Sequence, residues 1–253
     1  MTKKSVFSKD EGVLTSDISK KKFVDFEQAY HAVRTLEKRI LSIEEVKKLP
    51  FPDKNSPDFN LWGIRRKNIF RFLNHLLKKK KTLRVLDIGC GNGFFPNMMA
   101  QHGHQVVGVD VNLVELKQAA QAFPNEKLKW YYLDLMTEQL TEEPFDVITF
   151  CASFHYFSNP KQLLQICKTY LKPAGEIHII DSPFYTVEEK AAAKQRSIAH
   201  FKSLGVEAMA AHYYHNNLDV LNECKFQFGY TPGRLLVKLF RMKDSQFYWI
   251  IIK

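Results

Sequence analysis

The sequence predicts an α/β fold in which a mostly parallel sheet is flanked by helices. Two observations carry this prediction. Short apolar runs alternate with helical patterns from residue 83 to residue 181, and a glycine-rich turn follows the first apolar run. Strands that alternate with helices favour a parallel sheet with helices on both faces. The 253 residues suffice for one such domain with an added element.

The glycine-rich turn occupies residues 87–93, between an apolar strand at 83–86 and a helix that begins near Phe94. Its glycines let backbone approach a ligand without an intervening Cβ. A second acid, Asp110, ends the next apolar strand, residues 106–109, where an acidic side chain could hold a ribose diol. A strand, a glycine turn and a helix N-terminus together indicate a nucleotide-binding corner.

The first 80 residues predict a helical cap. Residues 1–22 are polar and basic, and we expect them to be loosely held. Phe23, Phe26, Tyr30 and Val33 recur at helical spacing. A capping box at 42–45 starts a short helix, and 61–77 is again helical. The expected division is therefore a cap at 1–80 and a main domain at 81–253.

The rest of the chain predicts further strands at 128–133, 145–150 and 176–181. Helices follow the capping residues Asn112 and Asn159. Beyond the last of these strands the rhythm changes, and residues 183–224 form an insertion. A capping box at 186–189 opens its helix, which ends near Leu204. Residues 225–230 and 246–252 predict two closing strands, with 234–242 between them.

The composition indicates a globular protein with a formal charge of +10. Lysine runs at 20–22 and 78–81 carry part of the excess, either as solvated helix ends or as a polyanion-binding patch. The four cysteines form no CxxC pair, which favours reduced thiols. No signal peptide and no apolar run of roughly 20 residues occurs. We therefore expect a soluble, cytoplasmic protein without a membrane partner.

Five motifs between residues 83 and 182 resemble those of the class I methyltransferases that use S-adenosylmethionine, in particular the small-molecule, type 11-like group. Their order and spacing match, and the one minor departure is Ala174-Gly175 where Gly-Gly is usual. The motifs are Val85-Leu86-Asp87-Ile88-Gly89-Cys90-Gly91-Asn92-Gly93, Val107-Gly108-Val109-Asp110, Leu133-Asp134-Leu135, Phe145-Asp146-Val147-Ile148 running to Phe154-His155-Tyr156-Phe157, and Leu171-Lys172-Pro173-Ala174-Gly175-Glu176.

The resemblance implies a Rossmann-like sheet of seven strands in the order 3-2-1-4-5-7-6, with strand seven antiparallel. It also implies S-adenosylmethionine as cofactor and S-adenosylhomocysteine as product. Asp87 would contact the ammonium group, Asp110 both ribose hydroxyls, and Asp134 the adenine amino group. The full implied cofactor set is Asp87, Gly89, Cys90, Gly91, Gly93, Asp110, Val111, Asp134, Leu135 and Cys151.

Other nucleotide sites fit the sequence less well. The chain has no GxxxxGK[ST] motif, which excludes a P-loop. A nicotinamide site shares the glycine turn and the ribose acid, but its fingerprint is Gly-x-Gly-x-x-Gly, whereas this chain has Gly-x-Gly-x-Gly. A binding module without catalytic activity also remains open.

The methyl acceptor should lie beyond the carboxyl ends of strands four and five. The catalytic candidates are His155, Asp181 and Tyr185, with His155 as a general base. His155 could instead pack on aromatic neighbours or contact the cofactor, and Asp181 could cap a helix. The substrate candidates are Trp62, Arg65, Arg66, Tyr213, Tyr214 and His215.

For each group of substrate candidates, more than one interpretation remains open. The insertion is either a substrate lid or a flap packed on the surface. The Trp62 segment either closes over the cofactor, or holds an anionic acceptor, or is an exposed basic face with Trp62 in the core.

His212 and His215 have i,i+3 spacing but no matching third ligand, so no metal is expected. The run Asp181-Ser182-Pro183-Phe184 is similar to an adenine N-methylation motif but follows strand five rather than strand four. We therefore expect in-line methyl transfer to a small molecule. The alternatives are an RNA or protein methyltransferase that uses the basic surface, and a noncatalytic S-adenosylmethionine-binding protein. The sequence does not indicate an oligomeric state.

Overall fold

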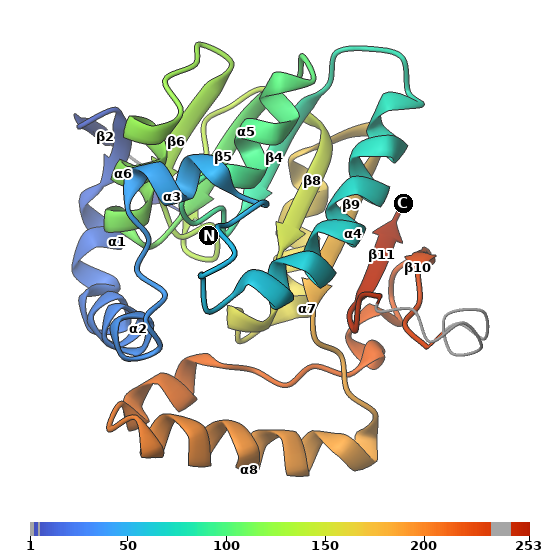
Figure 1. The fold of residues 1–253 in the computed structure, drawn as a ribbon. Coiled ribbons are helices and arrows are strands. Elements are labelled where there is room, and N and C mark those ends of the chain that lie inside the picture. Colours follow the sequence, from blue (N-terminus) through green and yellow to red (C-terminus); the bar gives the residue numbers. More distant parts are fainter. Residues whose placement is uncertain (1–2, 5, 234–243) are drawn as a thin grey trace.

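A nine-stranded mixed sheet organises the molecule in the computed structural model (Figure 1). The structure describes residues 3–4, 6–233 and 244–253. The strand order is β10-β11-β9-β8-β4-β5-β6-β3-β2, and a separate parallel pair joins β1 (Lys3–Lys4) to β7 (Glu138–Gln139). The expected connection at 234–242 lies outside the described residues.

Six neighbouring strands of the sheet, from β3 to β9, run parallel, whereas β2, β10 and β11 each pair antiparallel with their neighbours. The expected count of seven strands is wrong, because an N-terminal hairpin adds two strands beside β6. The strands are β2 (Phe7–Asp10), β3 (Val13–Ser16), β4 (Arg84–Ile88), β5 (Gln105–Asp110), β6 (Leu128–Tyr132), β8 (Phe145–Cys151), β9 (Leu171–Ser182), β10 (Phe226–Tyr230) and β11 (Tyr248–Ile252).

The N-terminal hairpin corrects the expectation that residues 1–22 are loosely held. Val13 and Thr15 of β3 are fully buried, and β3 pairs with β6 through three consecutive residues. Behind it, the buried Glu138 carboxylate accepts hydrogen bonds from the hydroxyls of Ser16 and Ser19. This segment is short and mostly polar, so its sequence carries little hydrophobic periodicity, and a tertiary contact orders it.

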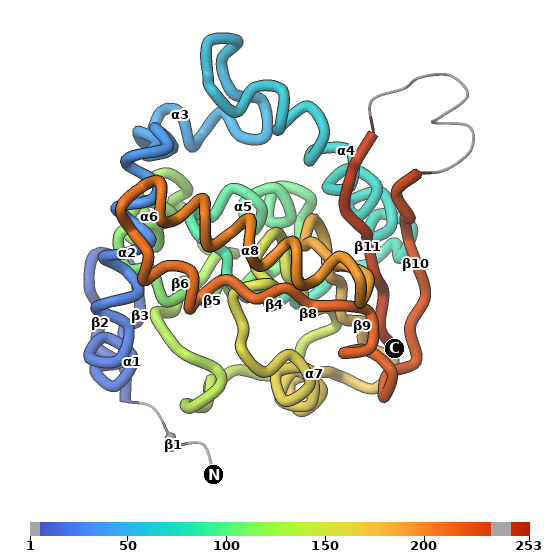
Figure 2. The backbone as a smooth tube through the Cα atoms, turned by 90° about the horizontal axis from the view of Figure 1, so that it is seen from below, coloured from blue at the N-terminus to red at the C-terminus, as the bar shows by residue number. Residues whose placement is uncertain are grey.

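Helices cover both faces of the sheet (Figure 2). α4, α5 and α6 lie on one face and α7 on the other. The predicted capping residues are confirmed, with capping boxes at Ser42 and Thr186, N-caps at Asn112 and Asn159, and Pro160 in the first turn of α7. The helices are α1 (Asp17–Lys22), α2 (Val24–Leu36), α3 (Ile43–Lys48), α4 (Phe59–Leu77), α5 (Phe94–Gln101), α6 (Leu113–Ala122), α7 (Pro160–Thr169) and α8 (Val187–Ser203).

The insertion lies across the carboxyl ends of the central strands. In Figure 1 the β8 arrow points toward α8, and in Figure 2 α8 crosses in front of the strand ends. Three short 3-10 helices belong to this region: η1 (Phe154–Tyr156), η2 (Glu207–His212) and η3 (Leu218–Leu221). A small hydrophobic cluster joins α2 to the insertion through Ala29, Val33, Phe201 and Met209.

The first 80 residues therefore do more than cap the sheet. β2 and β3 extend it, and α4 packs against it with Phe72 and Leu76 fully or almost fully buried. The domain boundary at residue 80 remains a prediction. Within the part of the chain that the structure describes, no helix is both long and apolar enough to cross a bilayer.

Two glycine-to-alanine substitutions test the packing. A Cβ at Gly108 in β5 would lie 2.7 Å from the Trp130 ring and 2.8 Å from the Cys90 sulfur, whereas one at Gly63 in α4 would meet no atom within 4 Å. We expect Gly108→Ala to lower the free energy of unfolding by about 1–3 kcal/mol through overpacking. Gly63→Ala should raise it by about 0.5–1 kcal/mol, because alanine favours the helix. Urea denaturation measures both, and equal effects would contradict the packing described here.

Candidate functional site

The glycine turn between β4 and α5 has a backbone conformation that residues with a Cβ rarely adopt. Gly89, Gly91 and Gly93 have φ values of +73°, +51° and +77°, in the left-handed region that favours glycine. A Cβ at Gly89 would collide with Ser153, and one at Gly93 would lie 2.6 Å from Ala119 and Trp130. The turn therefore leaves bare backbone at the sheet edge, next to the N-terminus of α5.

The Asp110 carboxylate holds this turn in place. One oxygen accepts from the Gly91 N–H at 2.7 Å, and the other accepts from Val111 at 2.7 Å and Asn112 at 2.9 Å. Burial and the nearby Glu115 raise the pKa of Asp110 to about 7, although the three backbone donors oppose the shift. Asp110, the second acid predicted from the sequence, thus lies beside the glycine turn.

Asp87 lies one strand away with half of its carboxylate unsatisfied. Oδ1 accepts from the Thr149 hydroxyl at 2.6 Å, whereas the buried Oδ2 has no hydrogen-bond donor among the described residues. Burial raises the pKa of Asp87 to about 7. A buried carboxylate oxygen without a donor is costly, so a cationic ligand group would be stabilised there.

Cys90 and Cys151 extend this row of groups. Burial raises the pKa of both thiols, and Asp110 acts further on Cys90, as Asp181 does on Cys151. Both cysteines therefore remain protonated and serve as packing groups between the acids.

Asp134 and Leu135 continue the edge beyond β6, and both are buried. Oδ2 of Asp134 accepts from the Lys22 ammonium at 2.6 Å and from the Thr137 hydroxyl at 2.8 Å. Oδ1 accepts only from the Met136 N–H, at 2.9 Å. The carboxylate thus orders its own turn and anchors α1, and it retains acceptor capacity on Oδ1.

Asp181 ends β9 in a strained conformation, with φ at +54° and a buried side chain. Its Oδ1 accepts from the Asn68 amide at 3.3 Å. Its Oδ2 lies 3.7 Å from the Arg65 Nε, an ion-pair contact too long for a hydrogen bond. Burial raises the pKa of Asp181 to about 6, with Arg65 opposing the shift.

Strain of this kind in a non-glycine residue is common at functional sites. The ion-pair contact brings Asp181 and Arg65 together at the end of β9. The Arg65 guanidinium also lies over the Trp62 ring at 5.0 Å.

His155 lies in η1 beneath the insertion. Its ring is 4.4 Å from that of Tyr156 and 4.7 Å from that of Tyr213, and its Nδ1 has no partner among the described residues. Burial, reinforced by Arg65 and Arg34, lowers the pKa of His155 to about 3. The ring is therefore neutral at physiological pH.

The insertion contributes the remaining candidates. The Tyr214 N–H donates to the His155 carbonyl at 2.8 Å, and the Tyr185 N–H donates to the Asn216 carbonyl at 2.9 Å. The His215 ring is 5.4 Å from that of Tyr185, and its Nε2 lies 2.8 Å from the Ser197 hydroxyl. These segments thus surround the strand ends as a connected set.

Arg66 and the two histidines of the insertion, His212 and His215, make separate contacts. Arg66 lies over the exposed Phe51 ring at 5.2 Å rather than beside Asp181. His212 contacts the Phe26 ring at 5.1 Å, whereas His215 faces Ser197. The i,i+3 spacing of the two histidines therefore serves two separate packing contacts.

A polar group from α2 also lies near the site and was not predicted from the sequence. The Arg34 guanidinium donates to the Tyr30 hydroxyl at 2.7 Å, and both side chains interact electrostatically with Glu115 and Tyr156. Glu115 in turn lies over Gly91. The signal was an arginine four positions after a tyrosine on an otherwise apolar helix face, which also fits a solvated helix surface.

A second titratable cluster lies away from this site. The Glu176 carboxylate of β9 contacts the His75 Nε2 at 2.9 Å, the Lys79 ammonium at 2.7 Å and the His178 Nε2 at 3.4 Å. The Trp249 N–H donates to the His178 Nδ1 at 3.1 Å, so the neutral His178 ring carries its proton on Nε2. A metal ligand needs a lone pair there, and the donor set therefore fits a hydrogen-bonded carboxylate better than a metal.

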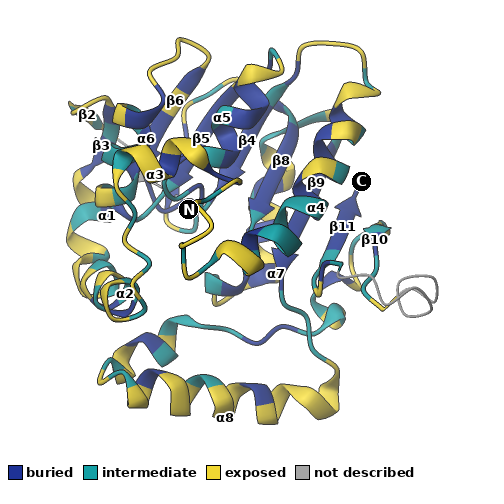
Figure 3. Cartoon of the chain, viewed as in Figure 1, coloured by how far each residue is buried: buried dark blue, intermediate teal, exposed yellow. Residues whose placement is uncertain are grey.

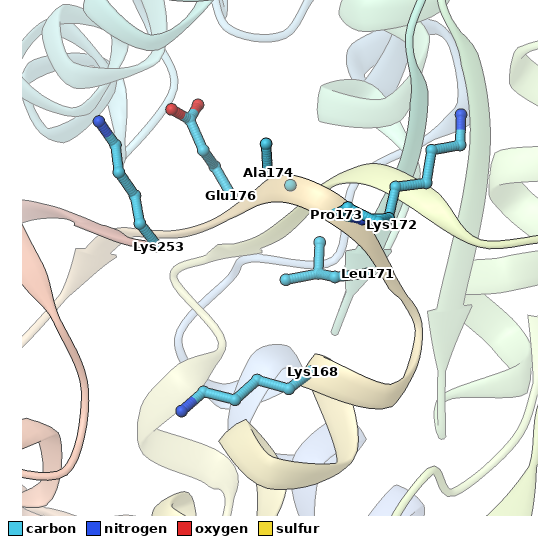
Figure 4. Close-up of a pocket in the computed structure, with 8 residues that line it drawn as sticks. Lys168, Leu171, Lys172, Pro173, Ala174, Glu176 and Lys253 are labelled. Atoms are coloured by element: carbon cyan, nitrogen blue, oxygen red, sulfur yellow. The ribbon is translucent and has the colours of Figure 1, made fainter.

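A pocket of about 590 Å³ lies at the start of β9 (Figure 4). It includes Glu176, five residues before Asp181 and therefore roughly 16 Å from it along an extended strand. The row of acids formed by Asp87, Asp110, Asp134 and Asp181 thus lies at the other end of β9 from this pocket. The pocket is lined by Lys168, Leu171, Lys172, Pro173, Ala174, Gly175, Glu176 and Lys253.

Comparisons with known proteins agree with this geometry. Residues 86–179 match the family model described as a methyltransferase domain. An uncharacterized methyltransferase of Mycobacterium tuberculosis is 28% identical over 99 residues, which cover 39% of this chain and 50% of that protein. A ubiquinone biosynthesis O-methyltransferase of Haemophilus ducreyi is 32% identical over 133 residues, which cover 49% and 56%. The chain thus spans about half the length of the curated relatives it matches.

A solved structure shares the fold over nearly the whole chain. It is the plantazolicin methyltransferase BpumL in complex with a triazolic desmethylPZN analogue and SAH, with a TM-score of 0.53 and 18% identity. The alignment covers 94% of this chain and 98% of that protein. Residues 86–179 thus match the methyltransferase domain family, and the chain as a whole shares its fold with this solved methyltransferase.

Proposed function

We propose that this protein transfers a methyl group from S-adenosylmethionine to a small-molecule acceptor. The observation that carries the proposal is the row of buried and half-buried acids at the carboxyl ends of the strands, above all the buried Asp87 Oδ2, which has no donor among the described residues and lies beside a turn of bare backbone. A ligand with an ammonium group, a sulfonium and ribose hydroxyls complements acceptors of this kind.

The residues present fit that cofactor. Asp87 Oδ2 would take the ammonium group, and Asp110 would accept from the ribose hydroxyls with its remaining lone pairs. Oδ1 of Asp134 and the buried Leu135 would meet the adenine, with Gly89, Cys90 and Cys151 close by. Arg34, which lies near Glu115 and Tyr156, would balance the charge of the cofactor's own carboxylate.

The segments over the strand ends support a compact acceptor. The small cluster that joins α2 to α8 and η2 encloses this side, and its aromatic members contact Tyr156 and Tyr213. Water exclusion by such segments favours methyl transfer over hydrolysis. Two of the matched proteins are named as a ubiquinone biosynthesis O-methyltransferase and a plantazolicin methyltransferase, and these names support an acceptor of that size.

The bound cofactor supplies an electrophilic methyl group, and the electrons of its broken C–S bond remain on sulfur. The protein must align the acceptor so that its lone pair forms the new bond in line with the bond that breaks. Asp181 would accept the acceptor's proton on Oδ2, because its pKa of about 6 leaves it ionised yet basic near neutrality. Arg65 would hold that carboxylate in place.

His155 is a weaker base candidate than Asp181. A ring whose pKa lies near 3 holds a proton poorly at neutral pH. We propose instead that its neutral ring and Tyr213 position the acceptor, and that Tyr185, Tyr214 and His215 support them from the insertion. Trp62 would close the side beside Arg65.

The ribose assignment predicts a loss of cofactor binding in Asp110→Ala. We expect the dissociation constant of S-adenosylhomocysteine to rise at least about 100-fold, because two hydroxyls lose a charged acceptor. Isothermal titration calorimetry measures this, and a wild-type protein that does not bind would overturn the proposed function.

The same substitution also removes the acceptor for three backbone donors, so a ligand-based control is needed. The 2′-deoxy analogue of S-adenosylhomocysteine should bind the wild type more weakly than the parent compound, and should bind Asp110→Ala as well as the parent does. An equal loss in both proteins would contradict the contact.

The base assignment predicts that Asp181→Asn lowers kcat by about 100-fold or more, because the proton acceptor is lost. The affinity for S-adenosylhomocysteine should stay within about threefold, because other residues bind the cofactor. The assay uses as its substrate a phenolic acceptor that has first been found by screening. The wild-type rate should rise with pH through about 6 and then level, whereas the variant should lack this step. A variant with an unchanged rate would rule out the base.

The buried His155 ring predicts acid sensitivity. Its pKa is near 3 in the fold against about 6.5 when unfolded, so the unfolded chain binds more protons between these values. Stability is therefore lost as pH falls below about 6.5. Between pH 7 and pH 5, we expect His155→Gln to lose about 2 kcal/mol less free energy of unfolding than the wild type. Denaturant titrations at both pH values measure this, and parallel losses would argue against a buried neutral ring.

A further inference from the structure

The outer face of α4 carries a partly exposed stripe of apolar side chains, against which the Phe51 ring packs. Phe59, Arg66, Phe70 and Leu77 follow one another by seven, four and seven positions, so they lie within about 40° of one another around the helix. Phe59 and Phe70 are each 37% exposed and Leu77 is 50% exposed. The outward side of α4 is exposed or half-buried along much of its length (Figure 3). An apolar stripe of this length indicates an interaction surface.

The segment that contains this stripe also carries most of the protein's excess charge. Residues 43–81 hold eleven lysines and arginines against four acids, which gives +7 of the total of +10. Among the described residues, Lys54, Arg66, Lys78 and Lys80 make no ion pair with an acid. The partner of this face must therefore be anionic.

The shape of the stripe favours a planar partner. Four collinear side chains span about 27 Å along a straight helix. A second copy of the chain would bring Arg66 and its neighbouring cations against one another, which is unfavourable.

A nucleic acid would need open aromatic faces for base stacking. The rings of Phe59 and Phe70 are largely packed, and Phe51 is covered by Arg66 at 5.2 Å and by Phe70 at 5.9 Å. Ring edges flanked by unpaired cations suit shallow contact with lipid headgroups instead.

We propose that the outer face of α4, defined by Phe51, Phe59, Arg66, Phe70 and Leu77, binds the surface of an anionic membrane. The apolar edges would enter the headgroup region, and Arg66, Lys54, Lys78 and Lys80 would contact anionic headgroups. This contact lies on the surface and needs no spanning segment, and it departs from the sequence-based expectation of no membrane partner, which considered only a spanning segment. It is independent of the methyl-transfer proposal.

Co-sedimentation with vesicles tests the surface. The full chain should bind phosphatidylcholine vesicles that contain phosphatidylglycerol, should bind pure phosphatidylcholine at least tenfold more weakly, and should be released by high salt. Leu77→Asp and Arg66→Glu should each weaken binding at least tenfold. Val187→Asp and Lys190→Glu, on exposed positions of α8, are the matched controls and should leave binding unchanged.

Several results would overturn the proposal. They are no binding to the anionic vesicles, equal loss in the α8 controls, or unchanged binding in both α4 variants. Concentration-dependent dimers that Leu77→Asp disrupts would assign the face to a second copy. Binding of a single-stranded RNA that Arg66→Glu abolishes, without vesicle binding, would assign it to nucleic acid. Thermal unfolding and S-adenosylhomocysteine affinity, unchanged in each variant, exclude misfolding as the cause.

Discussion

The hydrogen bond from the Gly91 N–H to the Asp110 carboxylate is the contact on which the site depends. It joins the turn after β4 to the end of β5, while the other carboxylate oxygen caps the backbone before α6. A buried carboxylate is costly, and here three backbone donors compensate it. Because those donors fix the left-handed turn, they also determine where bare backbone faces a ligand. The same residue thus orders the fold, and in the proposed function it would offer its remaining lone pairs to a cofactor.

Charge is separated across the molecule. Asp87 and Asp181 are buried and Asp110 is half-buried at the strand ends, and desolvation raises the pKa of each above its ordinary value. Their environment favours a cationic ligand, because such a ligand would restore the ionised form. The excess of cations lies elsewhere, mainly in residues 43–81. A basic protein therefore holds an acidic site, and its net charge says little about the ligand of that site.

Sequence periodicity predicted the part of the fold in which each strand is buried on both faces. The strands β4, β5, β6, β8 and β9 carry apolar runs, and capping residues mark the helices between them. The N-terminal hairpin was missed because its strands are short and polar and are ordered by pairing with β6 and by Glu138. The residues of the site divide in the same way into those that local sequence predicts and those that it does not. The positions of Asp87 and Asp110 follow from local motifs, whereas Arg34 comes from a helix that no motif marks. Its approach to Glu115 depends on tertiary packing.

The cluster between α2 and the insertion extends this argument to the acceptor. Phe26 contacts His212 at 5.1 Å, and Tyr30 contacts Tyr156 at 6.0 Å. The groups that face the strand ends from this cluster are aromatic, and His155 among them is neutral because burial lowers its pKa to about 3. In the proposed function, the donor side of the site is therefore acidic, and the acceptor side is largely aromatic, with Asp181, Arg65 and Arg34 as its charged groups. An acceptor enclosed there would, in the proposed function, meet a single carboxylate able to take its proton, so the base would be selected by its aromatic surroundings as much as by its own position.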